Sequence, residues 1–273
     1  MDIKKSIEKA KKLRLEVKHI PSSEGPEQGT ENGDLGWVSP DYCESRSIEL
    51  NLKKLGKNRC VCILPDAQEL GFYKVLRTQI QHRCKEKGWN TIMITSALPG
   101  EGKTLTSINL ALTFAKQFIH TVLLVDCDFK RQNVHKYLGF KSDKGLIDNL
   151  VEDVPLKDLI IWPCVEKLCV ISGGSPVHNS TELLSSPKMK TIITEMKKRY
   201  PDRYVIFDVP PVLVSADATA FAPLVDCIVM VVQAASTSIQ DIRNALEMIP
   251  QEKFLGLVLN RQAGPMKDYY KYY

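Results

Sequence analysis

The sequence predicts an α/β protein in which helices cover both faces of a mostly parallel sheet. Short apolar runs recur from residue 91 onward, and stretches with helical spacing separate them. Strands that are apolar throughout are typical of parallel sheets buried on both faces, and strands alternating with helices form three-layer α/β/α domains. A glycine-rich segment between the first of these strands and the next helix is the third observation, because such folds bind ligands there.

The expected elements follow one another in a regular order. Residues 105–118 carry apolar side chains every three to four positions, the spacing of one helix face. Further helices are expected at Pro187–Lys198 and Ile239–Ile249. Strands are expected at Thr91–Thr95, Thr121–Val125, Leu168–Ile171, Tyr204–Phe207, Cys227–Val232 and Phe254–Leu259.

The chain divides into three segments. Residues 1–17 predict a basic amphipathic helix, which could lie on an anionic membrane, dock on a partner or stay solvated. Residues 18–58 are rich in proline, glycine and serine, so 1–58 is expected to be a helix followed by a flexible linker. Residues 59–262 form the predicted nucleotide-binding domain, and residues 263–273 form a predicted mobile tail.

Composition and charge narrow the classes of function. The net charge is only +5 over 273 residues, and nucleic-acid-binding proteins usually concentrate basic charge on one element, so we expect no nucleic-acid partner. The N-terminus lacks the apolar stretch of a secretory signal, and no apolar run reaches the roughly 18 residues that cross a bilayer. We therefore expect a cytoplasmic protein that reaches the membrane only by surface contact or through a partner.

The glycine-rich segment has the composition of a phosphate-binding loop. Small residues let backbone N–H groups surround phosphates, and the following helix N-terminus favours anions. Lys103 is expected to reach the β- and γ-phosphates of ATP, and the Thr104 hydroxyl to bind Mg²⁺, which prefers oxygen ligands. The predicted nucleotide-binding residues of the loop are Pro99, Gly100, Glu101, Gly102, Lys103, Thr104 and Leu105.

Acidic residues follow two of the expected strands. Asp126 and Asp128 come at the end of one strand, where alternation places them on the same side, and Asp208 ends another. At the carboxyl edge of a parallel sheet they would face the nucleotide. One carboxylate can hold Mg²⁺, and another can accept a proton from an attacking hydroxyl, so the pattern indicates phosphoryl transfer.

These motifs resemble those of the bacterial tyrosine kinase family over residues 59–273. Pro99 to Thr104 match its first motif, Asp126 and Asp128 its Asp-x-Asp-x-Arg motif, and residues 205–211 its third. The resemblance implies that residues 59–262 are the kinase domain. It also implies that Lys103 contacts phosphate, that Thr104, Asp126 and Asp208 serve the metal, and that Asp128 is the base. Asn260 resembles the family's adenine-reading asparagine, although asparagine at a strand end is also a common turn residue.

Three positions depart from the family pattern. Lys130 replaces the motif arginine, and lysine lacks the planar fork that binds phosphate through two hydrogen bonds. Residues 72–78 resemble the family's oligomerisation helix, Glu-x-x-Arg-x-x-Arg, with Arg77 in the last position and Lys74 in the middle one. Gly71 occupies the glutamate position. A homo-oligomer is still expected, on a weakened motif, and the alternative is a plain surface helix.

Four of the nine tyrosines lie in the last five residues, and this cluster predicts the phosphate acceptor. A mobile tail could reach the site of a neighbouring subunit, so autophosphorylation between subunits is expected; the alternative is an aromatic anchor packed on the core. The predicted acceptors are Tyr269, Tyr270, Tyr272 and Tyr273.

The resemblance also implies partners and a process. Such kinases act with a transmembrane polysaccharide co-polymerase that activates them and with a cognate tyrosine phosphatase, in exopolysaccharide synthesis or export. The residues before 59 also resemble the N-terminal extension of kinases from exosortase-linked exopolysaccharide clusters. Two alternatives stay open: an ATPase of the partitioning or cell-division-positioning type, although Leu98 stands where those ATPases carry a signature lysine, and a nucleotide-binding regulatory subunit without kinase activity.

Overall fold

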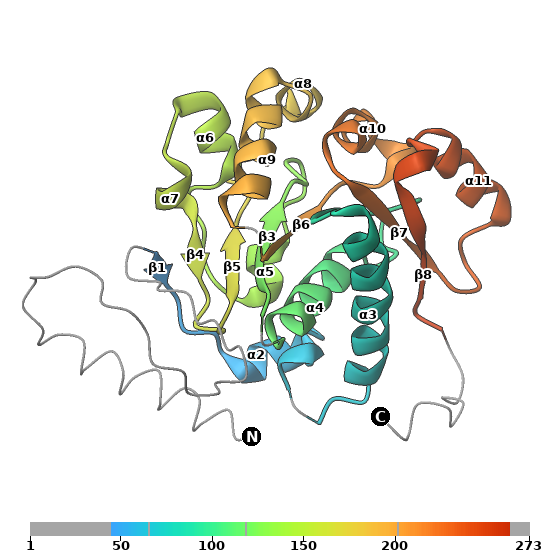
Figure 1. Cartoon of the computed structure of the whole chain (residues 1–273), viewed down its shortest axis with the longest axis horizontal. Coiled ribbons are helices and arrows are strands. Elements are labelled where there is room, and N and C mark those ends of the chain that lie inside the picture. The colour runs from blue at the N-terminus through green and yellow to red at the C-terminus, as the bar shows by residue number, and fades with distance from the viewer. Residues whose placement is uncertain (1–44, 65, 118, 201, 263–273) are drawn as a thin grey trace, which may run out of the picture. The chain divides into compact units, whose positions relative to one another are not determined.

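The computed structural model describes residues 45–64, 66–117, 119–200 and 202–262, and shows one sheet flanked by helices (Figure 1). Within these residues the sheet has eight strands in the order β1-β4-β5-β3-β6-β2-β7-β8. Every neighbouring pair is parallel except β4 and β5. The expected mostly parallel α/β sheet is thus confirmed. The strands are β1 (Arg46–Ser47), β2 (Thr91–Ser96), β3 (Thr121–Asp126), β4 (Ile161–Trp162), β5 (Leu168–Ile171), β6 (Arg203–Asp208), β7 (Cys227–Gln233) and β8 (Phe254–Asn260).

The helices agree with the expected positions with small shifts. The helix expected at 105–118 runs from 103 to 115, so Lys103 and Thr104 lie in its first turn rather than before it. The two later expected helices end within two residues of their predicted limits. The helices are α2 (Leu52–Lys57), α3 (Leu70–Lys87), α4 (Lys103–Ala115), α5 (Val134–Leu138), α6 (Leu146–Glu152), α7 (Leu156–Leu159), α8 (Ser180–Leu184), α9 (Pro187–Arg199), α10 (Ala216–Phe221) and α11 (Ile239–Glu247), with 3₁₀ turns at η2 (Val61–Ile63), η3 (Val212–Val214), η4 (Ala222–Leu224) and η5 (Gln251–Lys253).

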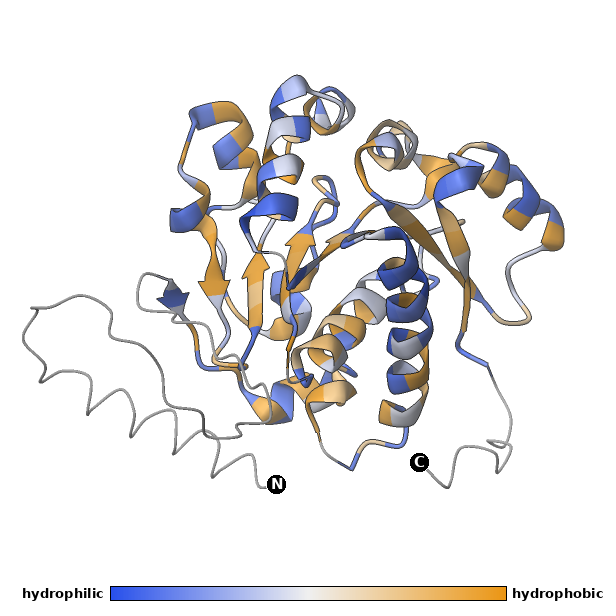
Figure 2. Ribbon diagram, viewed as in Figure 1, coloured by the Kyte–Doolittle hydropathy of each residue, from blue (hydrophilic) through white to orange (hydrophobic). Residues whose placement is uncertain are grey.

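The sheet has an apolar core on each face. In β2, Met93 packs in one core, whereas Ile92 and Ile94 pack in the other, and all three are fully buried. The core that contains Met93 is closed by residues of α6 to α11, and the second core by residues of α2 to α5. Because both faces of the strands are buried, both alternating sets of side chains are apolar, as the strands in Figure 2 show.

The segment before Arg59 differs from the expected linker. Residues 45–58 contain β1, which pairs with β4, and α2. Leu55 of α2 is fully buried, and the Asn58 side chain donates a hydrogen bond to the carbonyl oxygen of Tyr137 at 2.7 Å. One buried leucine and a few polar contacts therefore fix a segment whose composition is typical of linkers.

Two predicted segments lie outside the described residues. They are the basic helix of residues 1–17 and the tail of residues 263–273 with its four tyrosines. Among the described residues, no helix combines the length and the apolar character needed to cross a lipid bilayer.

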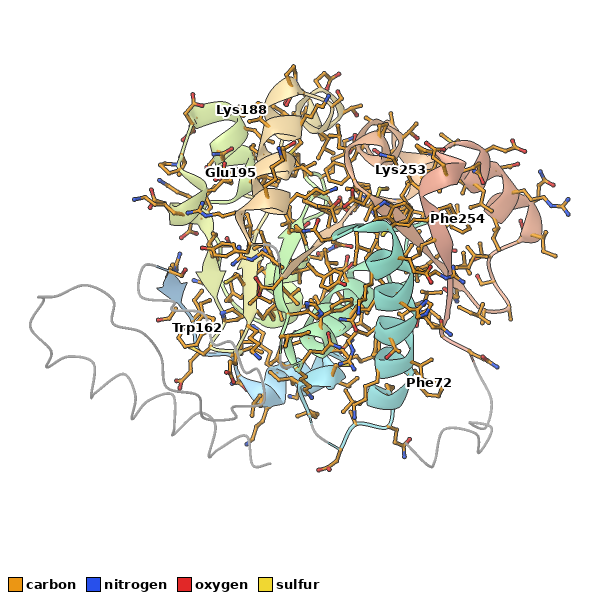
Figure 3. The ribbon with its side chains drawn as sticks, viewed as in Figure 1. Phe72, Trp162, Lys188, Glu195, Lys253 and Phe254 are labelled. Carbon is orange, nitrogen blue, oxygen red and sulfur yellow. The ribbon has the colours of Figure 1, made fainter. Side chains whose placement is uncertain are left out.

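Helix α3, which contains the segment resembling an oligomerisation helix, is fastened to the rest of the fold by arginines. The Arg77 guanidinium donates to the carbonyl oxygen of Thr113 in α4 at 2.8 Å, and Arg83 donates to the carbonyl oxygen of Leu255 in β8. Phe72 lies near the start of this helix (Figure 3). The arginine that matches the motif best is therefore engaged inside the subunit.

Asp226, which directly precedes β7, is hydrogen-bonded to the start of β2. Its carboxylate accepts hydrogen bonds from the backbone N–H groups of Asn90 at 3.0 Å and Thr91 at 3.1 Å, and it pairs with Lys197. Burial of this carboxyl raises its pKa, but the Lys197 ammonium and these N–H donors outweigh burial, so the pKa lies below the ordinary value of 3.8.

Replacing Asp226 with alanine should destabilise the protein by about 2–3 kcal/mol at pH 7, because buried donors lose their acceptor. The folded-state pKa is lower than the unfolded one, so this stabilisation is complete above about pH 4 and is lost as the pH falls through the folded-state pKa. Urea unfolding from pH 7 to pH 3 should show the two proteins converging. Asp143→Ala, at an exposed carboxylate, is the control, and an unchanged unfolding midpoint for D226A would contradict the assignment.

Candidate active site

The predicted phosphate loop connects β2 to α4, and its conformation requires glycine. Gly100 has φ +84° and Gly102 has φ +99°, backbone angles that other residues rarely adopt. A Cβ atom built on Gly102 would lie 2.1 Å from Nδ2 of Asn260. The loop leads directly into α4, whose first N–H groups have no partners within the helix and favour an anion.

Two contacts from distant segments hold the loop. The carboxylate of Glu101 accepts the backbone N–H of Leu98 at 2.8 Å and the hydroxyl of Thr237, which follows β7. The side-chain amide of Asn260, at the end of β8, donates to the carbonyl oxygen of Glu101 at 2.7 Å. Asn260 therefore borders the loop, and its amide oxygen is not used in that bond. Thr237 was not predicted, because no local pattern marks it.

The predicted metal ligands meet where β6 lies between β3 and β2. Asp126 and Asp208 pair across β3 and β6, and both are fully buried. Asp208 accepts the Thr104 hydroxyl at 2.6 Å and the Ser107 hydroxyl at 3.2 Å. Ser107 was missed, although its position one turn after Thr104 on the same helix face could have identified it.

Asp126 is a buried carboxylate with a raised pKa. Burial and the neighbouring Asp208 raise its pKa to about 7, against the lowering effect of Lys103. One carboxylate oxygen accepts the backbone N–H groups of Asn133 and Val134 at 3.1 and 3.0 Å. Burial also raises the pKa of Asp208. Two adjacent buried carboxyls with raised pKa values form a site poised for a cation.

Lys103 lies among these carboxylates. Its Nζ is 2.9 Å from Asp128 and 3.5 Å from Asp208, and the side chain is almost fully buried. Burial lowers the pKa of this ammonium, but the carboxylates of Asp208 and Asp128 outweigh burial and the net pKa is raised. The lysine is therefore charged at neutral pH. The structure thus brings together all the predicted catalytic and metal-binding side chains, Lys103, Thr104, Asp126, Asp128 and Asp208.

The donor set fits magnesium rather than a transition metal. A hydroxyl and carboxylates are hard oxygen ligands, and Mg²⁺ is usually held by one or two carboxylates together with phosphate oxygens. Among the described residues, no three acidic, histidine or cysteine side chains form a metal-holding group by themselves. Thr104 and Asp208, with Asp126 beside them, would hold Mg²⁺.

Position 130, where the family pattern has arginine, contacts another carboxylate. Lys130 Nζ lies 3.3 Å from Asp217 in α10, and Asp217 is fully buried. Asp217 also accepts the hydroxyls of Ser180, at 2.9 Å, and Thr181, both in α8. Burial raises the pKa of Asp217, but these hydroxyls and Lys130 outweigh burial and hold it below 3.8. Lys130 therefore contacts Asp217 and Ser215 rather than the phosphate loop.

The fold and the site together define a P-loop nucleotide-binding protein, and comparisons with known proteins narrow the class. A family model described as an AAA domain matches residues 89–255. The tyrosine-protein kinase YwqD of Bacillus subtilis is 33% identical over 203 residues, which are 74% of this chain and 84% of that kinase. This chain belongs to the bacterial tyrosine kinase family.

Other relatives differ in how much of their length is matched. The putative tyrosine-protein kinase EpsB of Ralstonia nicotianae is 30% identical over 74% of this chain but only 27% of EpsB. Among solved structures, the chimerical protein CapA2B2 superposes with a TM-score of 0.70 at 28% identity, over 80% of this chain and 94% of that one. The match with EpsB therefore covers only a part of that longer protein.

Proposed function

We propose that this protein transfers the γ-phosphate of ATP to tyrosine. The observation that carries the proposal is the cluster at the start of α4, where a charged lysine, a threonine hydroxyl and three carboxylates face one helix N-terminus. Membership of the tyrosine kinase family supports the same reaction. The fold alone would not, since P-loop domains of this kind serve several functions.

The side chains divide the chemistry between them. Lys103 would bind the β- and γ-phosphates, and Thr104, Asp208 and Asp126 would hold Mg²⁺, which neutralises phosphate charge when bound. The phenol oxygen of the acceptor attacks the γ-phosphorus, the bond from phosphorus to the ADP oxygen breaks, and Asp128 accepts the phenolic proton. A free tyrosine has a pKa of about 10, so Asp128 takes this proton late in the transfer.

The nucleotide's base has a candidate partner in Asn260. Its amide nitrogen donates to the carbonyl oxygen of Glu101. The amide oxygen would then accept a hydrogen bond from the adenine amino group. The same contact places this residue against the phosphate loop. Nucleotide binding and the end of β8 are therefore coupled in this proposal.

The acceptors that we propose are Tyr269, Tyr270, Tyr272 and Tyr273, presented by a neighbouring subunit of a homo-oligomer. Each phosphate adds about −1.5 to −2 charges, so modified tyrosines would be repelled by the carboxylates of the site. The tail would then leave after phosphorylation. A membrane co-polymerase that activates the kinase, a cognate phosphatase and a role in exopolysaccharide synthesis complete the proposal, and they rest on the family resemblance.

Radiolabelled ATP tests the proposal against its alternatives. Purified protein incubated with γ-labelled ATP and Mg²⁺ should yield label on tyrosine. Release of free phosphate without labelled protein would favour an ATPase of the partitioning type, although Leu98 occupies the position of its signature lysine. Nucleotide binding with neither product would favour a regulatory subunit.

Deleting residues 269–273 should remove most of the label from the protein while nucleotide affinity stays within about twofold, because the tail carries the acceptors and no part of the phosphate loop. Mass spectrometry of phosphopeptides and a fluorescent-nucleotide titration measure the two quantities. A chain with the four tyrosines changed to phenylalanine is the matched control, since it keeps the length of the tail. Label that maps to Tyr73 would contradict the proposed acceptors.

A further inference from the structure

Lys130 and Asp217 connect the two acidic motifs of the site. Lys130 lies two residues after Asp128, and Asp217 lies nine residues after Asp208. Their side chains meet at 3.3 Å, and Lys130 Nζ is also 3.5 Å from the Ser215 hydroxyl. No pattern in the sequence links these two positions, because Asp217 comes 87 positions after Lys130.

Asp217 provides a firm anchor for this contact. Its carboxylate is fully buried and accepts the hydroxyls of Ser180 and Thr181. The connection that carries it is fixed at its other end as well, where the backbone N–H of Leu213 donates to the carbonyl oxygen of Ala97 at the start of the phosphate loop. A side chain bound to Asp217 is therefore held relative to the phosphate loop.

The turn that follows β3 carries the other half of this contact. Asp128 accepts the backbone N–H of Arg131 at 3.0 Å, so the direction of its carboxylate depends on the path of residues 128–131. Lys130 is in the middle of that turn, and its side chain is half exposed. Its contact with Asp217 gives the turn a second point of attachment beside the bond from Arg131 to Asp128.

We propose that Lys130 is a positioning residue, which holds Asp128 in register with the phosphate loop by binding Asp217, rather than a ligand of the phosphates. The inference rests on the proposed kinase function, in which Asp128 accepts the phenolic proton. Lysine is sufficient for this role because Asp217 needs one cation, not a planar fork. A lysine at position 130 in place of the motif arginine is then compatible with kinase activity.

Kinetics of Lys130→Met and Asp217→Asn separate positioning from phosphate binding. Each variant should lower kcat for tyrosine labelling roughly tenfold, because small misplacements of a catalytic group are costly, while the Kd for ATP changes less than about twofold. The double variant should fall no further than either single one, since both remove the same contact. Lys130→Arg should recover kcat to within about twofold, and Lys157→Met, at an exposed lysine of α7, is the control.

Other outcomes overturn the inference. Unchanged kcat in K130M, an ATP Kd weakened tenfold with kcat retained, or multiplied losses in the double variant would each exclude it. Hydrogen exchange of the amides of residues 127–133 gives a readout without catalysis, and it should rise in K130M but not in K157M. If wild-type protein labels no tyrosine, the proposed function fails. Unaltered hydrogen exchange in K130M would separately reject the positioning role of Lys130. Should D217N fail to fold, the Lys130 variants decide alone.

Discussion

Replacing Lys103 with methionine should reduce tyrosine labelling at least about a thousandfold. The variant removes the only cation that contacts Asp128 and Asp208 among the described residues, and with it the charge expected to stabilise the transferring phosphate. Initial rates with γ-labelled ATP measure the effect. A rate within tenfold of the wild-type rate would reject the assignment of the site.

The folded state of this variant requires a check at more than one pH. Lys103 lowers the pKa of both Asp126 and Asp208, so without it these carboxyls bind protons more tightly in the folded protein. Stability should then fall more steeply with rising pH than in the wild type, and circular dichroism at pH 6 is the fair comparison. Lys144→Met, at an exposed lysine, is the matched control and should keep full activity.

Replacing Gly102 with alanine should weaken nucleotide binding by about a hundredfold. Alanine at φ +99° is strained, and its Cβ would lie 2.1 Å from the Asn260 amide nitrogen, so the loop or β8 has to shift. Isothermal titration with ATP and Mg²⁺ measures the affinity. Kinase activity should fall with it, because Lys103 follows directly in the chain.

Three further variants separate strain from collision. Gly100→Ala has a similar φ, +84°, with no atom within 4 Å of the added Cβ, so it reports strain alone. Asn260→Ala removes the colliding atom together with the loop contact, so it should cost less affinity in the G102A background than in the wild type. Gly56→Ala, in open space at the end of α2, should change nothing. G102A affinity equal to that of the wild type would show that the loop adopts another path.

The sheet and the site were predictable because both follow from local rules. Each of the six expected strands extends no more than one residue beyond its predicted limits, since strands buried on both faces are apolar throughout. The convergence of Asp126 and Asp208 followed from the rule that parallel strands end at one edge. β1 and β4 are two residues long, too short to leave a periodic signal.

The missed contacts share a different cause. Thr237 reaches Glu101 across 136 residues, and Asp217, the partner of Lys130, lies in α10. Such pairs depend on how the helices and connections pack after the sheet has formed, and the sequence carries no spacing that would reveal them. The buried position of Leu55 was likewise hidden by the glycine- and lysine-rich composition around it.

The ion pair between Lys103 and Asp128 has a consequence for which nucleotides would support phosphoryl transfer. While the pair persists, the ammonium of Lys103 occupies the carboxylate that would accept the phenolic proton. A ligand that draws the ammonium toward its terminal phosphate would separate the pair and free the carboxylate to contact the acceptor hydroxyl. A nucleoside monophosphate, lacking the β- and γ-phosphates that Lys103 would bind, would leave the pair intact. Readiness for proton transfer would thus depend on the length of the phosphate chain rather than on recognition of the base.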